Sequence, residues 1–216
     1  RFSVLVTSAN DAVVAGPSNN ASVMFDVTNL GTSTDIIQFN IVDDGDMNWF
    51  SYSLSTTSVS IEAGATSTVV LTVREMATGA PLNGVTIALR ASSGNDGGVE
   101  DHRNITVRPQ VAGAEITVIA DDDQAQPGES IRGTVVVQNT GTGMDQLLLT
   151  TVGMDCGVTG LLNLEAGASS SAVAWSCLIN EDAQSGLGEL KFRVTSSARS
   201  EYVQSYTEIY TVEPSW

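Results

Sequence analysis

Apolar and polar residues alternate along most of this chain. Segments in which every second residue is apolar include 23–27, 37–41, 69–73 and 85–89. A period of two predicts β-strands with one buried face and one solvated face. No convincing amphipathic helix longer than a turn or two is present, and Gly, Asn, Asp and Pro separate the strand-like segments. This spacing is typical of an all-β sandwich.

The second half of the chain repeats the first. V-T-N-L-G-T-S-T-D at 27–35 matches V-Q-N-T-G-T-G-M-D at 137–145, at an offset of 110 residues. Further matches, at an offset of 103, join 62–65 to 165–168 and 90–93 to 193–196. Because separate motifs support each offset, the chain contains two related copies of one module.

A local deletion distinguishes the two copies. The difference between the offsets, 110 minus 103, places a seven-residue deletion in the second copy, between Asp145 and Glu165. The first copy has the additional residues around 43–49. We expect Trp49 to close one end of the first core, and a disulfide at Cys156 to replace that function in the second.

Each copy has about the length of a seven-stranded immunoglobulin-like sandwich. The boundary between the copies falls near 109–113, where Pro, Gly and Ala interrupt the alternating pattern. The sequence therefore predicts two tandem immunoglobulin-like antiparallel β-sandwiches, with domains 1–110 and 111–216. A linker this short favours a semi-rigid rod over flexibly joined beads.

The repeated motifs have structural explanations. In N-x-G, we expect the Asn to bond its own backbone and the Gly, at positions 31 and 141, to adopt a positive φ. In E-A-G-A, we expect Gly64 and Gly167 to supply the left-handed conformation of a tight turn.

The motifs also carry a family resemblance. In order they are V-x-N-x-G-T, a Trp in the following loop, an A-G turn into a V-x-L-x-V strand, and a strand ending in Ser-Ser. They occupy 27–31, Trp49, 59–64, 69–73 and 84–93 in the first copy, and 137–141, 162–167, 182–183, Gly186 and 193–196 in the second.

This series resembles the immunoglobulin-like family found beside bacterial and archaeal glycosidases, and is similar to the adhesion-related CARDB modules. The second copy departs from the pattern because it lacks the loop Trp and contains two Cys. The resemblance implies a spacer, adhesion or assembly unit, and it implies no catalytic residues.

Two cysteines, Cys156 and Cys177, lie in or beside strand-like segments. A metal site would need more Cys or His ligands than these two cysteines and the single histidine supply. A disulfide is therefore the favoured interpretation, and two reduced core thiols are the alternative. N-x-S/T triplets at Asn20 and Asn104 are candidate glycosylation sites. Together these features favour an extracellular or cell-surface location.

Charge limits the possible partners. The chain has 25 acidic and 9 basic residues, a net charge of −16, and Lys191 is its only lysine. Nucleic acid and anionic membrane surfaces are disfavoured, because both require clustered cations. With 42% apolar residues the chain is not a disordered acidic tail, and no apolar run approaches the ~18 residues of a membrane helix. Because residue 1 is Arg, we expect a mature product or an excised segment.

Catalytic chemistry finds little support in the sequence. The only histidine, His102, is expected in an exposed turn, and no nucleophile, phosphate-loop or metalloprotease motif is present. Acidic residues are abundant enough to supply a carboxylate pair for glycoside hydrolysis, yet none has an obviously apolar context that would raise its pKa. We therefore expect no enzymatic activity.

An acidic cluster is a candidate calcium site. Asp43, Asp44 and Asp46 lack the spacing of an EF-hand, but their loop is expected at the pole where the first domain meets the second, facing Asp145. Solvated acidic loops are the alternative interpretation. A melting curve unchanged by EDTA would count against Ca²⁺.

An aromatic row marks the last strand. Tyr202, Tyr206 and Tyr210 fall on one face of an expected strand, about 13 Å apart at ~3.3 Å per residue. Such a row stacks on sugar rings if it is exposed, or forms the core side of the strand with hydroxyls at the rim.

The leading functional hypothesis is a non-catalytic structural or adhesion module of a prokaryotic surface protein, a semi-rigid spacer or assembly unit. One alternative is a subunit of a filament or surface layer, polymerising when an end strand at 2–8 or 202–212 pairs with a neighbour's sheet edge. Another is a module that binds carbohydrate or a protein receptor.

Overall fold

The computed structural model describes residues 1–17, 19–43, 48–77, 79–154 and 156–214. Within these ranges every regular element is a β-strand, and no helix is long and apolar enough to cross a membrane. The chain divides into two compact units, Arg1–Gln110 and Val111–Trp216. These units are called the first and second domain below, and they have the boundary expected from the sequence.

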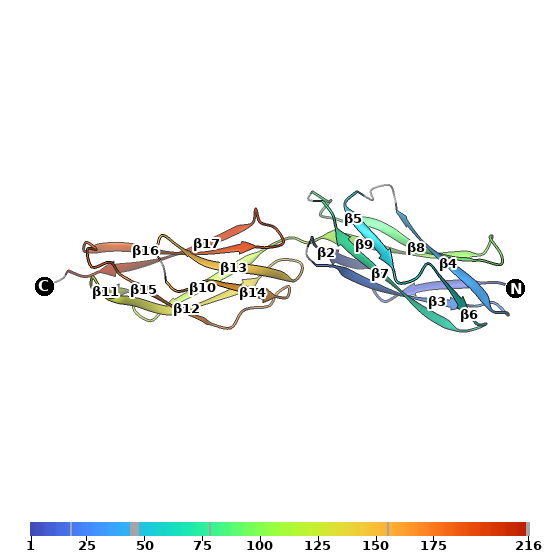
Figure 1. Cartoon of the computed structure of the whole chain (residues 1–216), viewed down its shortest axis with the longest axis horizontal. Helices are drawn as coiled ribbons and strands as arrows, with labels where there is room; N and C mark the ends of the chain where they lie inside the picture. The colour runs from blue at the N-terminus through green and yellow to red at the C-terminus, as the bar shows by residue number, and fades with distance from the viewer. Residues whose placement is uncertain (18, 44–47, 78, 155, 215–216) are drawn as a thin grey trace. The chain divides into compact units, whose positions relative to one another are not determined.

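The first domain is a sandwich of two sheets (Figure 1). Its four-stranded sheet has the order β1 (Val4–Ser8), β3 (Ala21–Asn29), β7 (Thr66–Glu75) and β5 (Phe50–Leu54). Its five-stranded sheet has the order β2 (Ala12–Ala15), β9 (Glu100–Pro109), β8 (Val85–Ser93), β4 (Asp35–Asp43) and β6 (Ser58–Ile61). Neighbouring strands are antiparallel except β2 and β9, which are parallel. The consecutive strands β1 and β2 thus belong to opposite sheets.

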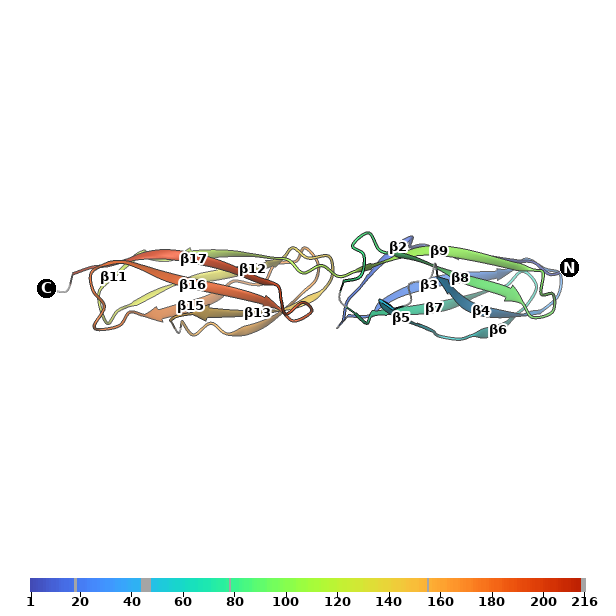
Figure 2. The ribbon, with the colours of Figure 1, turned by 90° about the horizontal axis from the view of Figure 1, so that it is seen from above.

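The second domain repeats this plan, with one strand fewer among its described residues. Figure 2 shows its two layers from above. Its three-stranded sheet has the order β10 (Ala114–Ala120), β12 (Ser130–Asn139) and β15 (Val173–Leu178). Its five-stranded sheet has the order β11 (Gln124–Ala125), β17 (Val203–Val212), β16 (Gly186–Ser196), β13 (Asp145–Val152) and β14 (Gly160–Leu164). The pair β11 and β17 is parallel, like β2 and β9. Both domains are therefore immunoglobulin-like β-sandwiches, as the sequence predicted.

Alternation along the strands builds one core in each domain. On β3, the side chains of Val23, Phe25 and Val27 are fully buried, while the residues between them face outward. In the second domain, Trp175 and Phe192 come from opposite sheets and meet edge to face, with ring centroids 5.5 Å apart. Contacts of this kind hold the two layers of each sandwich together.

Trp175 has room in the core because Gly133 lies opposite it. The pair Gly133 and Trp175 on β12 and β15 occupies the place that Val23 and Leu71 occupy in the first domain. A Cβ at Gly133 would lie 2.6 Å from the Trp175 ring and 2.1 Å from the Ile119 carbonyl oxygen. Where the first domain pairs two side chains of medium size, the second domain thus pairs a small residue with a large one, and the core stays filled.

Candidate functional site

The repeated Asn is buried at one pole of each domain, where its side chain bonds separate segments of the chain together; a residue with this role is called a bracket below. Asn29 donates from Nδ2 to the carbonyl oxygens of Ser33 and Ile61, both at 2.9 Å, and accepts from the Gly31 N–H at 2.8 Å. The bond to Gly31 confirms that the Asn side chain caps its own turn. The bond to Ile61 ties the end of β3 to the end of β6.

Asn139 makes the same three bonds in the second domain. Its Nδ2 donates to Gly143 at 2.9 Å and Leu164 at 2.8 Å, and its Oδ1 accepts from the Gly141 N–H at 2.9 Å. Both Asn side chains are fully buried. Because the two geometries agree, the motif is explained by folding requirements alone.

The prediction of a positive φ at Gly31 and Gly141 is wrong, because among the described residues the glycines with positive φ do not include these two. Glycine is required there for space. A Cβ at Gly31 would lie 2.6 Å from the Arg1 carbonyl oxygen, and one at Gly141 2.5 Å from that of Val111. Gly64 and Gly167 have φ values of 75° and 79°, so the left-handed turns predicted for E-A-G-A are confirmed.

The repeated Asp is a second bracket at the same pole. Asp145 is buried, and its carboxylate accepts from the Ser196 hydroxyl at 2.5 Å and from the Ala198 N–H at 3.2 Å. In the first domain, Asp35 accepts from Asn95 Nδ2 at 2.8 Å. The Asp of each motif therefore ties the start of one strand to the turn that follows β16 or β8.

Of the four proposed calcium ligands, the structure describes the side chain of Asp145 alone. Asp44 and Asp46 lie outside the described residues, as does the side chain of Asp43 at the end of β4. The Asp145 carboxylate is directed into its own domain, where Ser196 and Ala198 bind it. The described residues contain no group of three or more acidic, His or Cys side chains placed to hold a metal ion.

The junction between the domains is bonded on both sides. The Gln110 N–H donates to the Ala15 carbonyl oxygen at 2.9 Å, within the first domain. The Val111 N–H donates to Thr142 Oγ1 at 2.8 Å, and the Val111 carbonyl oxygen accepts from the Thr142 N–H at 3.0 Å, within the second domain. These anchored residues are consecutive in sequence, so no unbonded residue separates the two domains.

A disulfide replaces a strand in the second domain. In the first domain β5 covers the edge of β7, and Tyr52 lies opposite Val73. In the second domain Cys156 forms a disulfide with Cys177 of β15, as predicted, and the Cys156 carbonyl oxygen accepts from the Ser176 N–H at 3.1 Å. Cys177 occupies the position of Val73, because each pairs at the equivalent register with β12 or β3.

Cys156 thus lies beside the edge of β15 that corresponds to the β5 edge of β7, without forming a ladder there. Cys156 and Val158 are buried in the core, and Met154 packs against it. Trp49 is partly buried against the first core, immediately before β5, and the described residues that precede Cys156 in the second domain include no tryptophan. The disulfide therefore substitutes for the β5 ladder, rather than for Trp49 as the sequence suggested.

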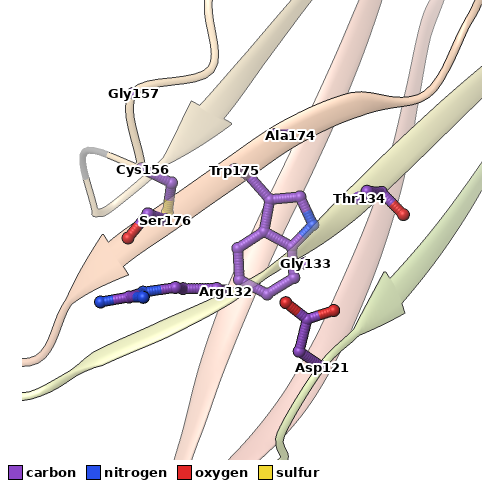
Figure 3. Close-up of a pocket in the computed structure, with 9 residues that line it drawn as sticks. All are labelled: Asp121, Arg132, Gly133, Thr134, Cys156, Gly157, Ala174, Trp175 and Ser176. Atoms are coloured by element: carbon purple, nitrogen blue, oxygen red, sulfur yellow. The ribbon is translucent and has the colours of Figure 1, made fainter.

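A shallow groove lies on the outer face of the three-stranded sheet beside this disulfide. Its volume is about 500 Å³ (Figure 3). Arg132 and Thr134 of β12, Ser176 of β15 and Asp121 line it, together with the loop at Gly157. Figure 3 shows the Arg132 guanidinium extending away from the Asp121 carboxylate. The lining offers one cation and two hydroxyls for a polar contact, and it includes no histidine to act as a base.

The two candidate glycosylation sites are both exposed. Asn20 lies just before β3, and Asn104 lies on the outer face of β9. His102 is also exposed, on the same face of β9 and not in a turn. These positions leave the amide groups of both sequons accessible to solvent.

The tyrosine row lies on the core side of the domain, with Tyr206 and Tyr210 on β17 and Tyr202 immediately before it. Tyr210 is buried, and Tyr202 and Tyr206 pack against the second core. The Ala114 N–H donates to the Tyr202 hydroxyl at 2.8 Å. The hydrogen bond from the Tyr206 hydroxyl to Glu208, with burial, raises the Tyr206 pKa above its ordinary value, and burial raises that of Tyr210. Of the two interpretations, the core-side one describes all three rings.

Two further polar contacts close the sandwich edge of the first domain. The Asp101 carboxylate accepts from the Val6 N–H at 2.8 Å, and Arg103 forms an ion pair with Asp11. Sequence reasoning missed both roles. The signal in the sequence is the alternation along the strand, which places residues 101 and 103 on the same inward face of β9 as the buried residues Ile105 and Val107.

No protein-family model matches this chain, and no curated protein matches it. Among solved structures, the chain is similar to the secreted serine protease VesC from Vibrio cholerae. The identity is 10%, covering 98% of this chain and 51% of that one, with a TM-score of 0.39. This chain thus spans about half the length of that protein.

Two other solved structures match over nearly their whole length. One is the Salmonella enterica SafA pilin in complex with the SafB chaperone, at 16% identity over 98% of this chain and 97% of that one, with a TM-score of 0.36. The other is the YadV chaperone, at 10% identity over 95% and 99%, with a TM-score of 0.35. At these identities the likeness concerns the β-sandwich fold, and no function is carried over.

Proposed function

We propose that this chain is a non-catalytic structural module of a prokaryotic surface or secreted assembly, acting as a semi-rigid spacer or assembly unit. The observation that carries the proposal is the bonded junction, in which Gln110 and Val111 are each anchored in their own domain. A joint without free residues restricts the motion of one domain relative to the other. A restricted joint suits a part that transmits position or force.

Several features support the location and the absence of catalysis. The Cys156–Cys177 disulfide is typical of oxidising compartments outside the cytoplasm. Asn20 and Asn104 are exposed where glycosylation would require it. The single histidine lies on an open strand face, and the sequence resembles the glycosidase-associated and CARDB modules, which implies no catalytic residues.

Spin-label distance measurements test the joint. Labels at Arg108→Cys and Glu165→Cys are suitable because both positions are exposed and lie near the junction residues of their respective domains. We expect a narrow distance distribution in the native chain, and a broad one when a short Gly/Ser segment is inserted between Gln110 and Val111. An equally broad distribution in both proteins would overturn the proposal.

One observation favours a second candidate function, assembly by strand addition. On the edge of β15 that lies away from β12, the described chain supplies one backbone bond, at Ser176, whereas β5 supplies a full ladder in the first domain. Open strand edges of this kind accept strands from other chains. If polymers form in this way, amide exchange at Ala174 and Leu178 will slow in the polymer. Unchanged exchange at both positions would exclude pairing at this edge.

A further inference from the structure

The outer face of the five-stranded sheet in the second domain carries a pair of cations. Lys191 and Arg193 are exposed neighbours on the outward side of β16. Among the described residues neither forms an ion pair. Two unpaired cations side by side are unexpected in a chain with 25 acidic and 9 basic residues. Glu189 is the one acidic residue on the outward positions of β16.

An apolar row crosses the same face beside the cations. Strand register places Leu161, Leu148, Thr195 and Val203 in line across β14, β13, β16 and β17. Leu161 is 56% exposed and Val203 is 41% exposed. Arg193 lies in the next row, between Thr150 and Ser205. The face therefore combines an exposed apolar strip with a flanking positive charge.

The opposite face of the same domain has the complementary character. On the outward side of β10, Glu115 is exposed and Ile119 is 60% exposed. Asp121 follows directly and lines the groove on this face, with the exposed Asp122 and Asp123 next in the chain. Arg132 is the cation within this face. The three-stranded sheet thus presents an apolar residue flanked by carboxylates.

We propose that the second domain binds a second copy of this chain, with the five-stranded face of one copy (the Lys191 face) on the three-stranded face of the next (the Glu115 face). This inference rests on the proposed assembly function. Opposite charges and exposed apolar residues on both faces supply the complementarity. Because the two surfaces differ, the contact is heterologous, and repetition of it produces an open polymer rather than a closed dimer.

The dimensions of the face set the strength of the contact. The smaller, Glu115 face limits the contact: three strands about 4.8 Å apart, and about six residues along each, cover roughly 14 Å by 20 Å. The two facing surfaces therefore bury roughly 600 Å² in total, which is below the size of a standard stable interface. At physiological salt the screening length is about 8 Å, so facing charges act strongly while distant acidic groups act weakly. Association is therefore weak in solution and strengthened where neighbouring contacts add along a polymer.

Charge reversal with rescue tests the contact by sedimentation velocity, at physiological salt and up to about 1 mM protein. We expect concentration-dependent association of the native chain, and an association constant about tenfold lower for Lys191→Glu with Arg193→Glu. The matched control is Arg74→Glu with Arg108→Glu, which changes the net charge equally but lies in the first domain. Adding Glu115→Lys and Asp121→Lys to the Lys191 and Arg193 variant should restore association.

Several results would overturn the proposal. They are a native chain that stays monomeric throughout, a control that weakens association as much as the variant, or a fourfold variant that does not recover although its melting curve is native. Binding of a sulfated polysaccharide to the monomer through Lys191 and Arg193 would instead assign the face to an acidic glycan. The spin-label experiment on the junction is performed on the monomer, so failure there and failure here are distinguishable.

Discussion

Removing the Asn139 side chain should destabilise the second domain by about 3 kcal/mol. The side chain is fully buried and makes three hydrogen bonds. Asn139→Ala leaves the Leu164 carbonyl oxygen buried without its donor, which costs about 1–3 kcal/mol. The Gly141 N–H and the Gly143 carbonyl oxygen are in part-buried bonds that water replaces in part, and each adds up to about 1 kcal/mol.

Urea unfolding followed by domain-resolved amide signals measures this loss. Val137 reports on the second domain and Val27 on the first, because both are fully buried strand residues. With an m-value of about 1.5 kcal/mol/M, the midpoint of the second domain should fall by about 2 M, while that of the first stays unchanged.

The control for this experiment is Asn163→Ala. Asn163 is exposed on β14 and accepts one bond from Gln146, so its loss should cost under about 0.5 kcal/mol. If Asn139→Ala shifts the midpoint no more than this control, the bracket does not stabilise the fold and the explanation of the repeated motif is refuted.

Three further predictions concern the second domain. Replacing Cys156 and Cys177 together by Ala should lower its unfolding free energy by about 3 kcal/mol in the same urea assay, and an unchanged midpoint would contradict the role given to the disulfide. Gly133→Ala should lower the unfolding free energy by about 2 kcal/mol, because the added Cβ would clash with the Trp175 ring and with backbone atoms. The control Gly97→Ala should be neutral, because no atom lies within 4 Å of its added Cβ. Equal melting temperatures for the two variants would refute the packing argument. The folded-state pKa of Tyr206 is raised, so the stability that this tyrosine contributes is complete below pH 10 and is lost as the pH rises through the folded pKa. Tyr206→Phe should therefore reduce the loss of stability at alkaline pH. If urea midpoints measured over a pH series fall as steeply in the variant as in the native chain, this prediction is wrong.

Strand alternation and the repeat were sufficient to predict the fold. Positions such as Val23, Phe25 and Val27 are buried as their period of two requires. The motif Asn and Asp carry their own signal, because a buried polar group that recurs in both copies must have partners in both. Such features depend on residues close in sequence or on a repeated context.

Other features depend on contacts that a single sequence does not reveal. Period two predicts that the three tyrosines share one face, but only the packing of the sandwich decides that this face is the inner one. Gly31 was misassigned because local turn statistics take no account of Arg1, which crosses it from a distant part of the chain. The replacement of the β5 ladder by a disulfide likewise becomes visible only when the strand registers of the two domains are compared.

The central claim is that the two sandwiches are held by a joint without free residues. The distance distribution between spin labels at Arg108→Cys and Glu165→Cys tests it most directly, with the Gly/Ser insertion after Gln110 as the reference for a flexible joint. The bonds at Gln110 and Val111 predict a narrow distribution that broadens on insertion. A native distribution as broad as that of the insertion variant would contradict the claim.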